Sequence, residues 1–265
     1  MRLLYLALPA LLYGVIYFLV SRIVYQPSCF PDGWWHMQAE VGAQEIWLHT
    51  TDGLRLNAWW VEVPGSRAAT LYLHGNGGNL SQRPGHLREM APAGSSVLIL
   101  DYRGYGKSPG RPTERGLYRD ADAGYDYLIG RGYQPSQIVL YGESLGSAVA
   151  ADLAARRPCG GVILECPFTS LGAMAGTVVP LVGPLFANGY HTRRKIAKVR
   201  APVLVIHGDR DRTVPYTMGR AVFEAAREPK SFWKVEGATH VDIVDVAGPL
   251  YRARLRAFYE GIGLL

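Results

Sequence analysis

The five residues 142–146 read Gly-Glu-Ser-Leu-Gly and place a serine between two glycines. They join an apolar, β-branched run at 138–141 to a run typical of a helix at 145–156. A sharp turn from strand to helix needs glycines for space, and it lifts the serine hydroxyl above the sheet. The turn also places Ser144 at a helix N-terminus, which favours developing negative charge. The pattern therefore predicts a nucleophile at Ser144, with a purely structural turn as the alternative.

A serine hydroxyl needs a base to remove its proton and an acid to orient that base. With the nucleophile on a strand-to-helix turn, the acid and then the histidine follow it in the chain. Three histidines come after Ser144. His207 closes an apolar strand and is expected to be buried, and His191 lies beside a basic cluster. His240 lies in the loop before the final helix, so we predict it as the base.

Three carboxylates are candidates for the acid. Asp209 and Asp211 both follow the strand that ends at His207, and Glu165 follows the strand at 161–164. Asp211 is farther from its strand end and can reach His240, whereas Asp209 is better placed to bind the N–H groups of its own loop. Asp211 is the predicted acid, and Glu165 and Asp209 are the alternatives.

An oxyanion formed by attack on an acyl group needs two fixed N–H donors. The backbone N–H of Leu145, directly after the serine, is one candidate. The loop at 74–79 reads His-Gly-Asn-Gly-Gly-Asn, and its glycines allow close approach of the backbone of Asn76, the second candidate. A phosphate-binding loop is the alternative, but the Lys-Ser/Thr ending of that motif is missing. These residues imply no metal and no organic cofactor, and His74 is expected to be structural.

Short β-branched runs alternate with helical patterns around these residues. Such alternation is typical of a mostly parallel sheet with helices on both faces, here of about eight strands. The first two strands, with a Thr-Asp-Gly turn between them, are expected to form an antiparallel hairpin. The expected strands are 45–50, 56–63, 70–74, 97–100, 138–141, 161–164, 203–207 and 231–235. The expected helices are 86–93, 113–130, 145–156 and 246–260.

These motifs together resemble the α/β-hydrolase superfamily. They are the loop at 74–79, Asp-Tyr-Arg-Gly-Tyr-Gly-Lys-Ser at 101–108, the turn at 142–146, Gly-Asp-Arg-Asp-Arg-Thr-Val-Pro at 208–215, and His240. The chain is most similar to the small, membrane-anchored serine hydrolases that are called serine-aminopeptidase-like and are related to protein depalmitoylases. The resemblance implies an α/β-hydrolase fold with Ser144, Asp211 and His240 as the triad. It also implies scaffold roles for Asp101 and Arg103, and the short stretch between 166 and 201 implies a minimal cap.

The composition excludes several classes of protein. With 265 residues, 48% hydrophobic and 19% charged, the chain can build a core and is not disordered. Five of the basic residues that give the net charge of +6 lie between 193 and 200, which speaks against a nucleic-acid-binding face. Three cysteines (Cys29, Cys159 and Cys166) cannot form a disulfide framework, and their redox state stays open.

Residues 3–21 carry no charge, and an arginine flanks each end. A helix of about 18–20 such residues crosses one bilayer core. No small-x-small cleavage site follows, so we predict an uncleaved anchor over 1–24 rather than a signal peptide. One arginine at each end gives little orientation, and we expect the domain on the non-cytoplasmic side. Residues 25–44 are expected to be a juxtamembrane linker and 45–265 the hydrolase domain, so that a chain starting near Gln38 keeps its activity.

The predicted function is hydrolysis of carboxylic esters or acyl thioesters, with small or lipid-like acyl compounds or acylated proteins as substrates. A serine peptidase that removes N-terminal residues is one alternative, with Glu143 or Glu165 binding the α-amine. A catalytically silent, membrane-tethered binding module is the other. The apolar run at 174–186 and the basic residues after it are either an ordinary packed segment or an acyl pocket beside anionic lipid.

Overall fold

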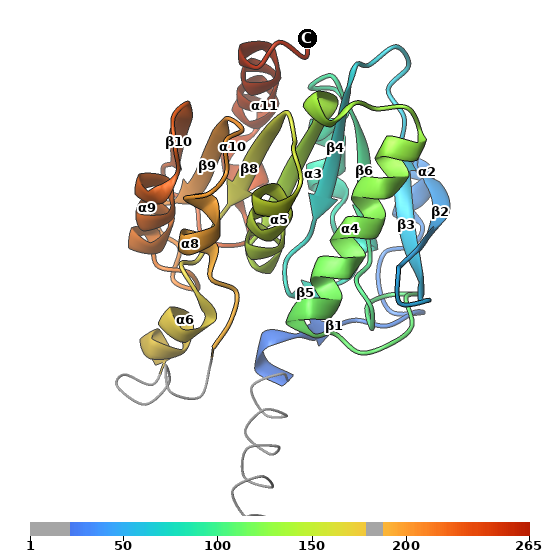
Figure 1. Cartoon of the computed structure of the whole chain (residues 1–265), viewed down its shortest axis with the longest axis horizontal. Coiled ribbons are helices and arrows are strands. Elements are labelled where there is room, and N and C mark those ends of the chain that lie inside the picture. Colours follow the sequence, from blue (N-terminus) through green and yellow to red (C-terminus); the bar gives the residue numbers. More distant parts are fainter. Residues whose placement is uncertain (1–21, 179–187) are drawn as a thin grey trace, which may run out of the picture.

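The computed structural model describes residues 22–178 and 188–265, and a sheet of eight strands forms its centre (Figure 1). In chain order the strands are β2 (Gln44–His49), β3 (Arg55–Val61), β4 (Ala68–Leu73), β6 (Ser95–Leu100), β7 (Ile138–Glu143), β8 (Gly161–Glu165), β9 (Val203–Gly208) and β10 (Lys230–Val235). Across the sheet the order is β10-β9-β8-β7-β4-β6-β3-β2. β3 is antiparallel to both β2 and β6, and the remaining pairs are parallel. The predicted sheet and its N-terminal hairpin are confirmed.

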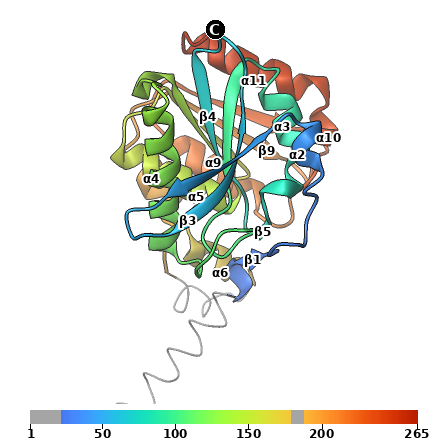
Figure 2. The same ribbon diagram turned by 90° about the vertical axis from the view of Figure 1, so that its right-hand side faces the viewer.

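Helices cover both faces of the sheet, as Figure 2 shows from its edge. One face packs against α4 (Glu114–Gly130), α5 (Leu145–Arg156), α8 (Thr192–Ile196) and α9 (Tyr216–Ala225). The other packs against α3 (Pro84–Met90), α10 (Ile243–Ala247) and α11 (Pro249–Gly261). The remaining described elements are α2 (Met37–Glu40), α6 (Leu171–Val178), the 3₁₀ turns Leu80–Gln82 and Pro135–Gln137, and a small parallel pair of β1 (Gln26–Pro27) with β5 (Gly77–Gly78).

Burial on both faces explains why the strands read as continuous apolar runs. In β4, Leu71 and Leu73 face the α4–α5 side while Tyr72 between them faces the α3–α11 side, and all three are fully buried. Because these strands run parallel, their carboxyl ends share one edge of the sheet. The predicted site residues lie at this edge, at or after the ends of β4, β7, β8, β9 and β10.

The helices differ in part from those expected. The predicted closing helix at 246–260 is two helices, because Gly248 has φ 52° and breaks the chain direction between α10 and α11. The helix α9 was missed by the sequence analysis; it directly follows the loop that carries Asp211.

Residues 25–37, which we call the strap, pack on the domain instead of forming the expected linker. Gln26 and Pro27 pair in parallel with Gly77 and Gly78 of the predicted oxyanion loop. Farther along, the Trp35 ring meets the buried Trp59 ring edge-on at 6.1 Å, and Met37 is buried. The linker expected over 25–44 is therefore structurally part of the hydrolase domain. The prolines and aromatic residues of this segment did not predict the pairing with 77–78, because backbone hydrogen bonds make that pairing.

The expected membrane anchor, residues 3–21, lies outside the described residues. Within 22–178 and 188–265, no helix is both long enough and apolar enough to cross a membrane. Residues 22–24 are helical and lead into β1 at the edge where the parallel strands have their carboxyl ends (Figure 1).

Candidate active site

Ser144 occupies a strained turn between β7 and α5. Its backbone has φ 49° and ψ −112°, a conformation that residues other than glycine rarely adopt. A Cβ atom at Gly142 would collide with the backbone of Gly146, and one at Gly146 would collide with the carbonyl of Leu73. Both glycines are therefore required for β7, β4 and α5 to approach closely enough to form this turn.

Two hydrogen bonds to the backbone of Ser144 hold the turn in place. The N–H of Ser144 donates to the carbonyl of Glu165 at 2.9 Å, which ties the turn to the end of β8. The hydroxyl of Ser147 donates to the carbonyl of Ser144 at 2.6 Å. These contacts fix the direction of the Ser144 side chain, which is nearly buried but remains reachable at the sheet edge.

His240 lies between Ser144 and Asp211. Its Nε2 is 3.0 Å from the Ser144 Oγ, and its Nδ1 is 2.7 Å from the Asp211 Oδ2. An ionised Asp211 accepts a hydrogen bond from the Nδ1–H group, so the proton stays on Nδ1 and the Nε2 lone pair is directed at the serine hydroxyl. The three residues come from the ends of β7, β9 and β10, as the sequence analysis predicts, and the structure brings them together.

Hydrogen bonds keep Asp211 ionised. Burial alone would raise the pKa of its carboxyl, but contacts with His207 and His240 and the backbone N–H of Val214 outweigh burial and lower that pKa. Its Oδ1 accepts from the N–H groups of Thr213 and Val214, both at 2.8 Å. For His240, burial would lower the imidazole pKa, but the hydrogen bond and charge of Asp211 raise it.

The loop after β4 lies beside the nucleophile. A Cβ at Gly75 would come within 3.6 Å of the Ser144 Cβ, so the loop backbone passes directly over the serine. The carbonyl of Asn76 accepts from the Gln26 N–H at 3.1 Å and from the Tyr105 hydroxyl at 2.9 Å. The N–H groups of Asn76 and Leu145 have no acceptor among the described residues. They can therefore serve as donors to an oxyanion.

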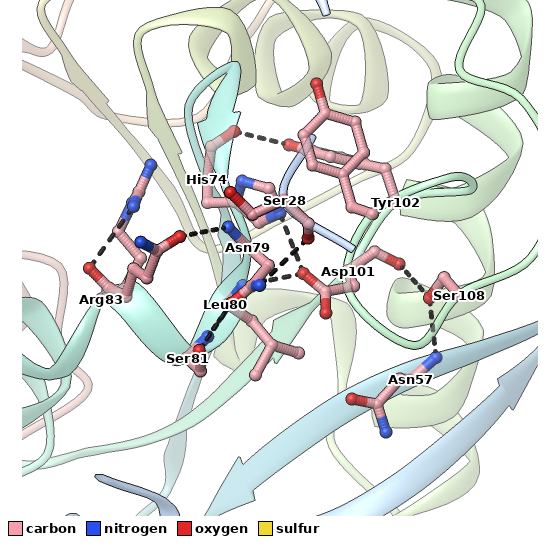
Figure 3. Close-up of polar contacts among 12 residues, drawn as sticks. Ser28, Asn57, His74, Asn79, Leu80, Ser81, Arg83, Asp101, Tyr102 and Ser108 are labelled. Carbon is pink, nitrogen blue, oxygen red and sulfur yellow. Dashed lines mark hydrogen bonds and ion pairs between the residues drawn. The ribbon is translucent and has the colours of Figure 1, made fainter. Parts of the chain in front are cut away.

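Hydrogen bonds of side chains from the loop itself and from the 101–108 segment fix this loop, and Figure 3 shows several of them. The Asn79 amide donates to the carbonyls of Ser28 and Asp32 in the strap, at 3.0 and 2.9 Å. Asp101 accepts from the N–H of Leu80 at 2.7 Å. The Tyr102 hydroxyl donates to the carbonyl of His74 at 3.0 Å (Figure 3). The loop is thus held from the strap on one side and from the 101–108 segment on the other.

Similarity to known proteins agrees with this geometry. Residues 64–194 match the family model described as "Serine aminopeptidase, S33". The chain is 38% identical over 260 residues to an uncharacterised protein of Mycobacterium tuberculosis, covering 95% of this chain and 92% of that protein. It is 36% identical to the human alpha/beta hydrolase domain-containing protein 17C, covering 85% of this chain and 68% of that protein. The chain belongs to the α/β-hydrolase family.

Solved structures agree with the α/β-hydrolase fold. An esterase of Pyrococcus furiosus superposes with a TM-score of 0.73 at 20% identity, covering 90% of this chain and 100% of that one. The esterase domain of a Rhodothermus marinus protein superposes with a TM-score of 0.62 at 22% identity, covering 81% of this chain and 98% of that one. The resemblance inferred from the motifs, including the serine-aminopeptidase-like branch, is confirmed, and the chain is a hydrolase of this family.

The alternative acids of this α/β-hydrolase are bound elsewhere. Glu165 accepts hydrogen bonds from the hydroxyls of Tyr141 and Tyr251, at 2.6 and 2.9 Å, and contacts His86 at 2.9 Å. Asp209 accepts from the N–H of Gly237 at 2.8 Å, as its position in the loop predicts. Neither carboxylate contacts His240 within the described residues.

The histidines set aside in the sequence analysis have structural surroundings. His207 is fully buried, and its Nε2 lies 3.0 Å from the Val214 carbonyl and 3.3 Å from the Asp211 Oδ2. The Nδ1 of His74 lies 2.7 Å from the carbonyl of Gly75. His207 therefore supports the acid from behind, a contact that the expectation of a merely buried imidazole did not include.

Arg83 is a residue of the site that the sequence analysis missed. Its Nε donates to Glu143 at 2.8 Å, and its Nη2 donates to the Gly77 carbonyl at 2.8 Å. It therefore joins the residue before the nucleophile to the oxyanion loop. The Tyr72 hydroxyl also donates to Glu143, at 2.6 Å. Burial would raise the Glu143 pKa, but the positive charge of Arg83 lowers it.

His86 is a second missed residue. Burial would lower the pKa of its imidazole, but the charge of Glu165 and their hydrogen bond raise it. His86 is thus linked to the turn that carries Ser144 through Glu165, whose side chain it contacts and whose carbonyl holds that turn. The sequence shows a histidine at the start of a predicted helix. No neighbouring residue in the sequence indicates that its partner is Glu165 on β8.

Proposed function

We propose that this α/β-hydrolase cleaves carboxylic esters or acyl thioesters through an acyl-enzyme on Ser144. One observation carries the proposal. The Ser144 hydroxyl, the His240 imidazole and the Asp211 carboxylate form a continuous chain of contacts of 3.0 and 2.7 Å. This chain of contacts provides the general base and the fixed tautomer that a serine nucleophile requires.

In the first half of the reaction, the Ser144 Oγ attacks the acyl carbon while His240 Nε2 takes its proton. Asp211 stabilises the imidazolium that forms. The negative charge on the former carbonyl oxygen is held by the N–H groups of Asn76 and Leu145, which have no acceptor among the described residues. The imidazolium then protonates the departing alkoxide or thiolate, leaving the acyl group on the serine.

In the second half, water replaces the departed alcohol or thiol. His240 removes a proton from that water, and the resulting hydroxide attacks the acyl carbon. Collapse of the second oxyanion intermediate breaks the ester bond to Ser144, whose oxygen recovers the proton from His240. The products are the carboxylic acid and the unchanged enzyme.

The proposed substrates are small or lipid-like acyl esters and thioesters, with acylated proteins as one class. This choice is supported by similarity to structures of esterases and by the resemblance to protein depalmitoylases. We further propose that residues 3–21 anchor the protein in a membrane, with the hydrolase domain on the non-cytoplasmic side. The uncharged length of that segment supports the anchor, and protease protection of intact vesicles tests the side.

An aminopeptidase is the second candidate, favoured by the description of the matching family model. Such an enzyme needs an anionic group for the substrate's α-amine. The two acids nearest to Ser144 in the chain and across the sheet already have partners, because Glu143 binds Arg83 and Glu165 contacts His86. This pairing favours the esterase and thioesterase over the peptidase.

The test is a substrate panel combined with an active-site label. We expect a fluorophosphonate probe to label the wild-type protein and not the Ser144→Ala protein. Removal of a triad serine should lower kcat by about 10⁶. A p-nitrophenyl ester chain-length series, an acyl thioester and an aminoacyl anilide then identify the substrate class. An unlabelled wild type would support a silent binding module, and faster anilide cleavage would support the peptidase.

A further inference from the structure

Cys166 lies directly behind the proposed triad. It is the first residue after β8, and its thiol is buried, with 1% of the residue exposed. Its backbone has φ 47°, and its N–H donates to the carbonyl of Ile206 on β9 at 2.8 Å. Because the backbone is held in this unusual conformation between two strands, the direction of the Cα–Cβ bond of Cys166 is fixed.

The thiol belongs to a compact group of metal-binding side chains. One ligand atom each from Cys166, Asp211 and His240 lie within 4.8 Å of one another, the only group of three or more found in the described part of the chain. Thiolate, imidazole and carboxylate are the three ligand types that zinc prefers. Bond lengths of about 2.0–2.3 Å to a tetrahedral ion place its ligand atoms roughly 3–4 Å apart. Binding an ion therefore needs side-chain rotations that separate the Asp211 Oδ2 from the His240 Nδ1, which are 2.7 Å apart.

We propose that Zn²⁺ binds Cys166, Asp211 and His240 and thereby inhibits the hydrolase. The proposed ligands are the Cys166 Sγ, a carboxylate oxygen of Asp211 and the His240 Nδ1, with water at the fourth position. Binding at these residues is independent of the reaction, whereas inhibition rests on the proposed function. The ion acts here as an inhibitor and has no role in the proposed reaction.

The charges around the thiol favour a divalent cation. Burial and the neighbouring charges of Glu165 and Asp211 raise the pKa of the Cys166 thiol well above its usual value. Burial opposes any charged group, but the two carboxylates attract a cation, and a bound ion stabilises the thiolate. The thiolate and the Asp211 carboxylate together carry two negative charges, which balance Zn²⁺.

Inhibition follows from the tautomer of His240. In the resting site Nδ1 carries the imidazole proton and Nε2, 3.0 Å from the Ser144 Oγ, accepts the serine proton. An ion can bind Nδ1 only after the proton has left that nitrogen. The neutral ring must then carry its proton on Nε2. The Cys166 thiol loses its proton to solvent, and the imidazole proton moves to Nε2 through solvent. His240 can then no longer act as a base towards Ser144.

The experiment measures binding of Zn²⁺ by calorimetry and of Cd²⁺ by its thiolate charge-transfer absorption, independently of turnover. The other two cysteines supply matched controls, because Cys29 is exposed and Cys159 lies in another part of the fold. We expect one equivalent of ion per wild-type chain and the same affinity for Cys29→Ser and Cys159→Ser. Cys166→Ser should weaken binding at least tenfold and remove the charge-transfer band.

Inhibition is measured on each variant relative to its own rate without metal, with chelator added to restore it. Ser144→Ala protein should bind the ion as wild type does, since Ser144 is not a ligand. If wild type binds no ion, or if Cys166→Ser binds and is inhibited as strongly as wild type, the zinc site is wrong. If the ion binds through Cys166 but no ester is cleaved by any variant, the zinc site stands and the proposed function fails.

Discussion

The backbone N–H of Gln26 donates a hydrogen bond to the carbonyl of Asn76 across 3.1 Å. Gln26 belongs to the strap, and Asn76 carries one of the two proposed oxyanion donors. The Ser28 N–H makes a similar bond to the Gly78 carbonyl at 3.0 Å, so the strap holds the oxyanion loop from both ends. A segment directly after the predicted anchor therefore holds the backbone of a proposed oxyanion donor.

A proline at position 26 should test this relationship, because proline lacks the N–H that binds Asn76. Loss of one such hydrogen bond is worth about 0.5–1.5 kcal/mol. We expect Gln26→Pro to lower kcat on a short ester by about threefold to tenfold with little change in KM. Gln26→Ala keeps the N–H and is the matched control. Equal rates for the two variants would show that the strap does not position Asn76.

The strap also changes where a soluble domain should begin. A chain starting near Gln38 keeps Ser144, Asp211 and His240 but removes Gln26 and the Trp35 ring that packs on Trp59. We expect that chain to unfold at a lower temperature and to hydrolyse short esters more slowly than a chain starting at Arg22. Thermal unfolding and steady-state rates of the two purified proteins provide the comparison. Indistinguishable proteins would restore the linker interpretation.

The parts of the site that the sequence predicts are those with a local pattern. Ser144 lies in a strand–turn–helix pattern, and His240 and Asp211 follow strands in the expected order. Arg83 and His86 escaped prediction because their partners, Glu143 and Glu165, lie at the ends of other strands. Only the packing of α3 against the sheet brings these charges together.

The strap escaped prediction for a different reason. In its bonds to the oxyanion loop at Asn76, Gly78 and Asn79, the strap contributes backbone N–H and carbonyl groups, so no side-chain pattern of the strap marks them. The division of the last helix at Gly248 was missed because an isolated glycine inside a helical pattern does not by itself end a helix.

The acid assignment predicts three different outcomes for three substitutions. Asp211→Asn should lower kcat by about 10⁴, because an amide no longer holds the correct tautomer of His240. Asp209→Asn should cost far less, since Asp209 accepts from the Gly237 N–H and pairs with Lys234, and does not contact His240 within the described residues. Glu165→Gln should also keep most of the rate. A loss with Glu165→Gln as large as that expected for Asp211→Asn would move the acid to β8.

The strained backbone of Ser144 predicts a gain in stability on its removal. A residue with a side chain at φ 49° and ψ −112° costs about 1–3 kcal/mol, and glycine adopts this conformation freely. Both Ser144→Gly and Ser144→Ala lack the nucleophile. We expect the glycine protein to have a free energy of unfolding about 1 kcal/mol higher than the alanine protein in urea.

Ser231 provides the control for that comparison, because it is exposed in the ordinary strand β10. There glycine should be less stable than alanine, by about 0.5–1 kcal/mol, since glycine loses more conformational entropy on folding. The sign of the difference between glycine and alanine should therefore reverse between positions 144 and 231. The same sign at both positions would mean that the turn at Ser144 is not strained.

The pH dependence of the reaction should follow His240, which must be neutral to accept the proton of Ser144. Burial would lower its pKa, but Asp211 and the more distant charges of Glu143 and Glu165 raise it. The protonated, inactive fraction is therefore larger at a given pH than for an ordinary histidine. We expect the rate of fluorophosphonate labelling to fall as the pH is lowered, with a midpoint above about 6.5.

In Asp211→Asn the raising contribution of the carboxylate to the His240 pKa is lost while the burial remains, so the midpoint should move to lower pH. Asp209→Asn, whose carboxylate does not contact His240, should leave the midpoint in place. A midpoint that Asp211→Asn leaves unchanged would assign the acid limb to a group other than His240.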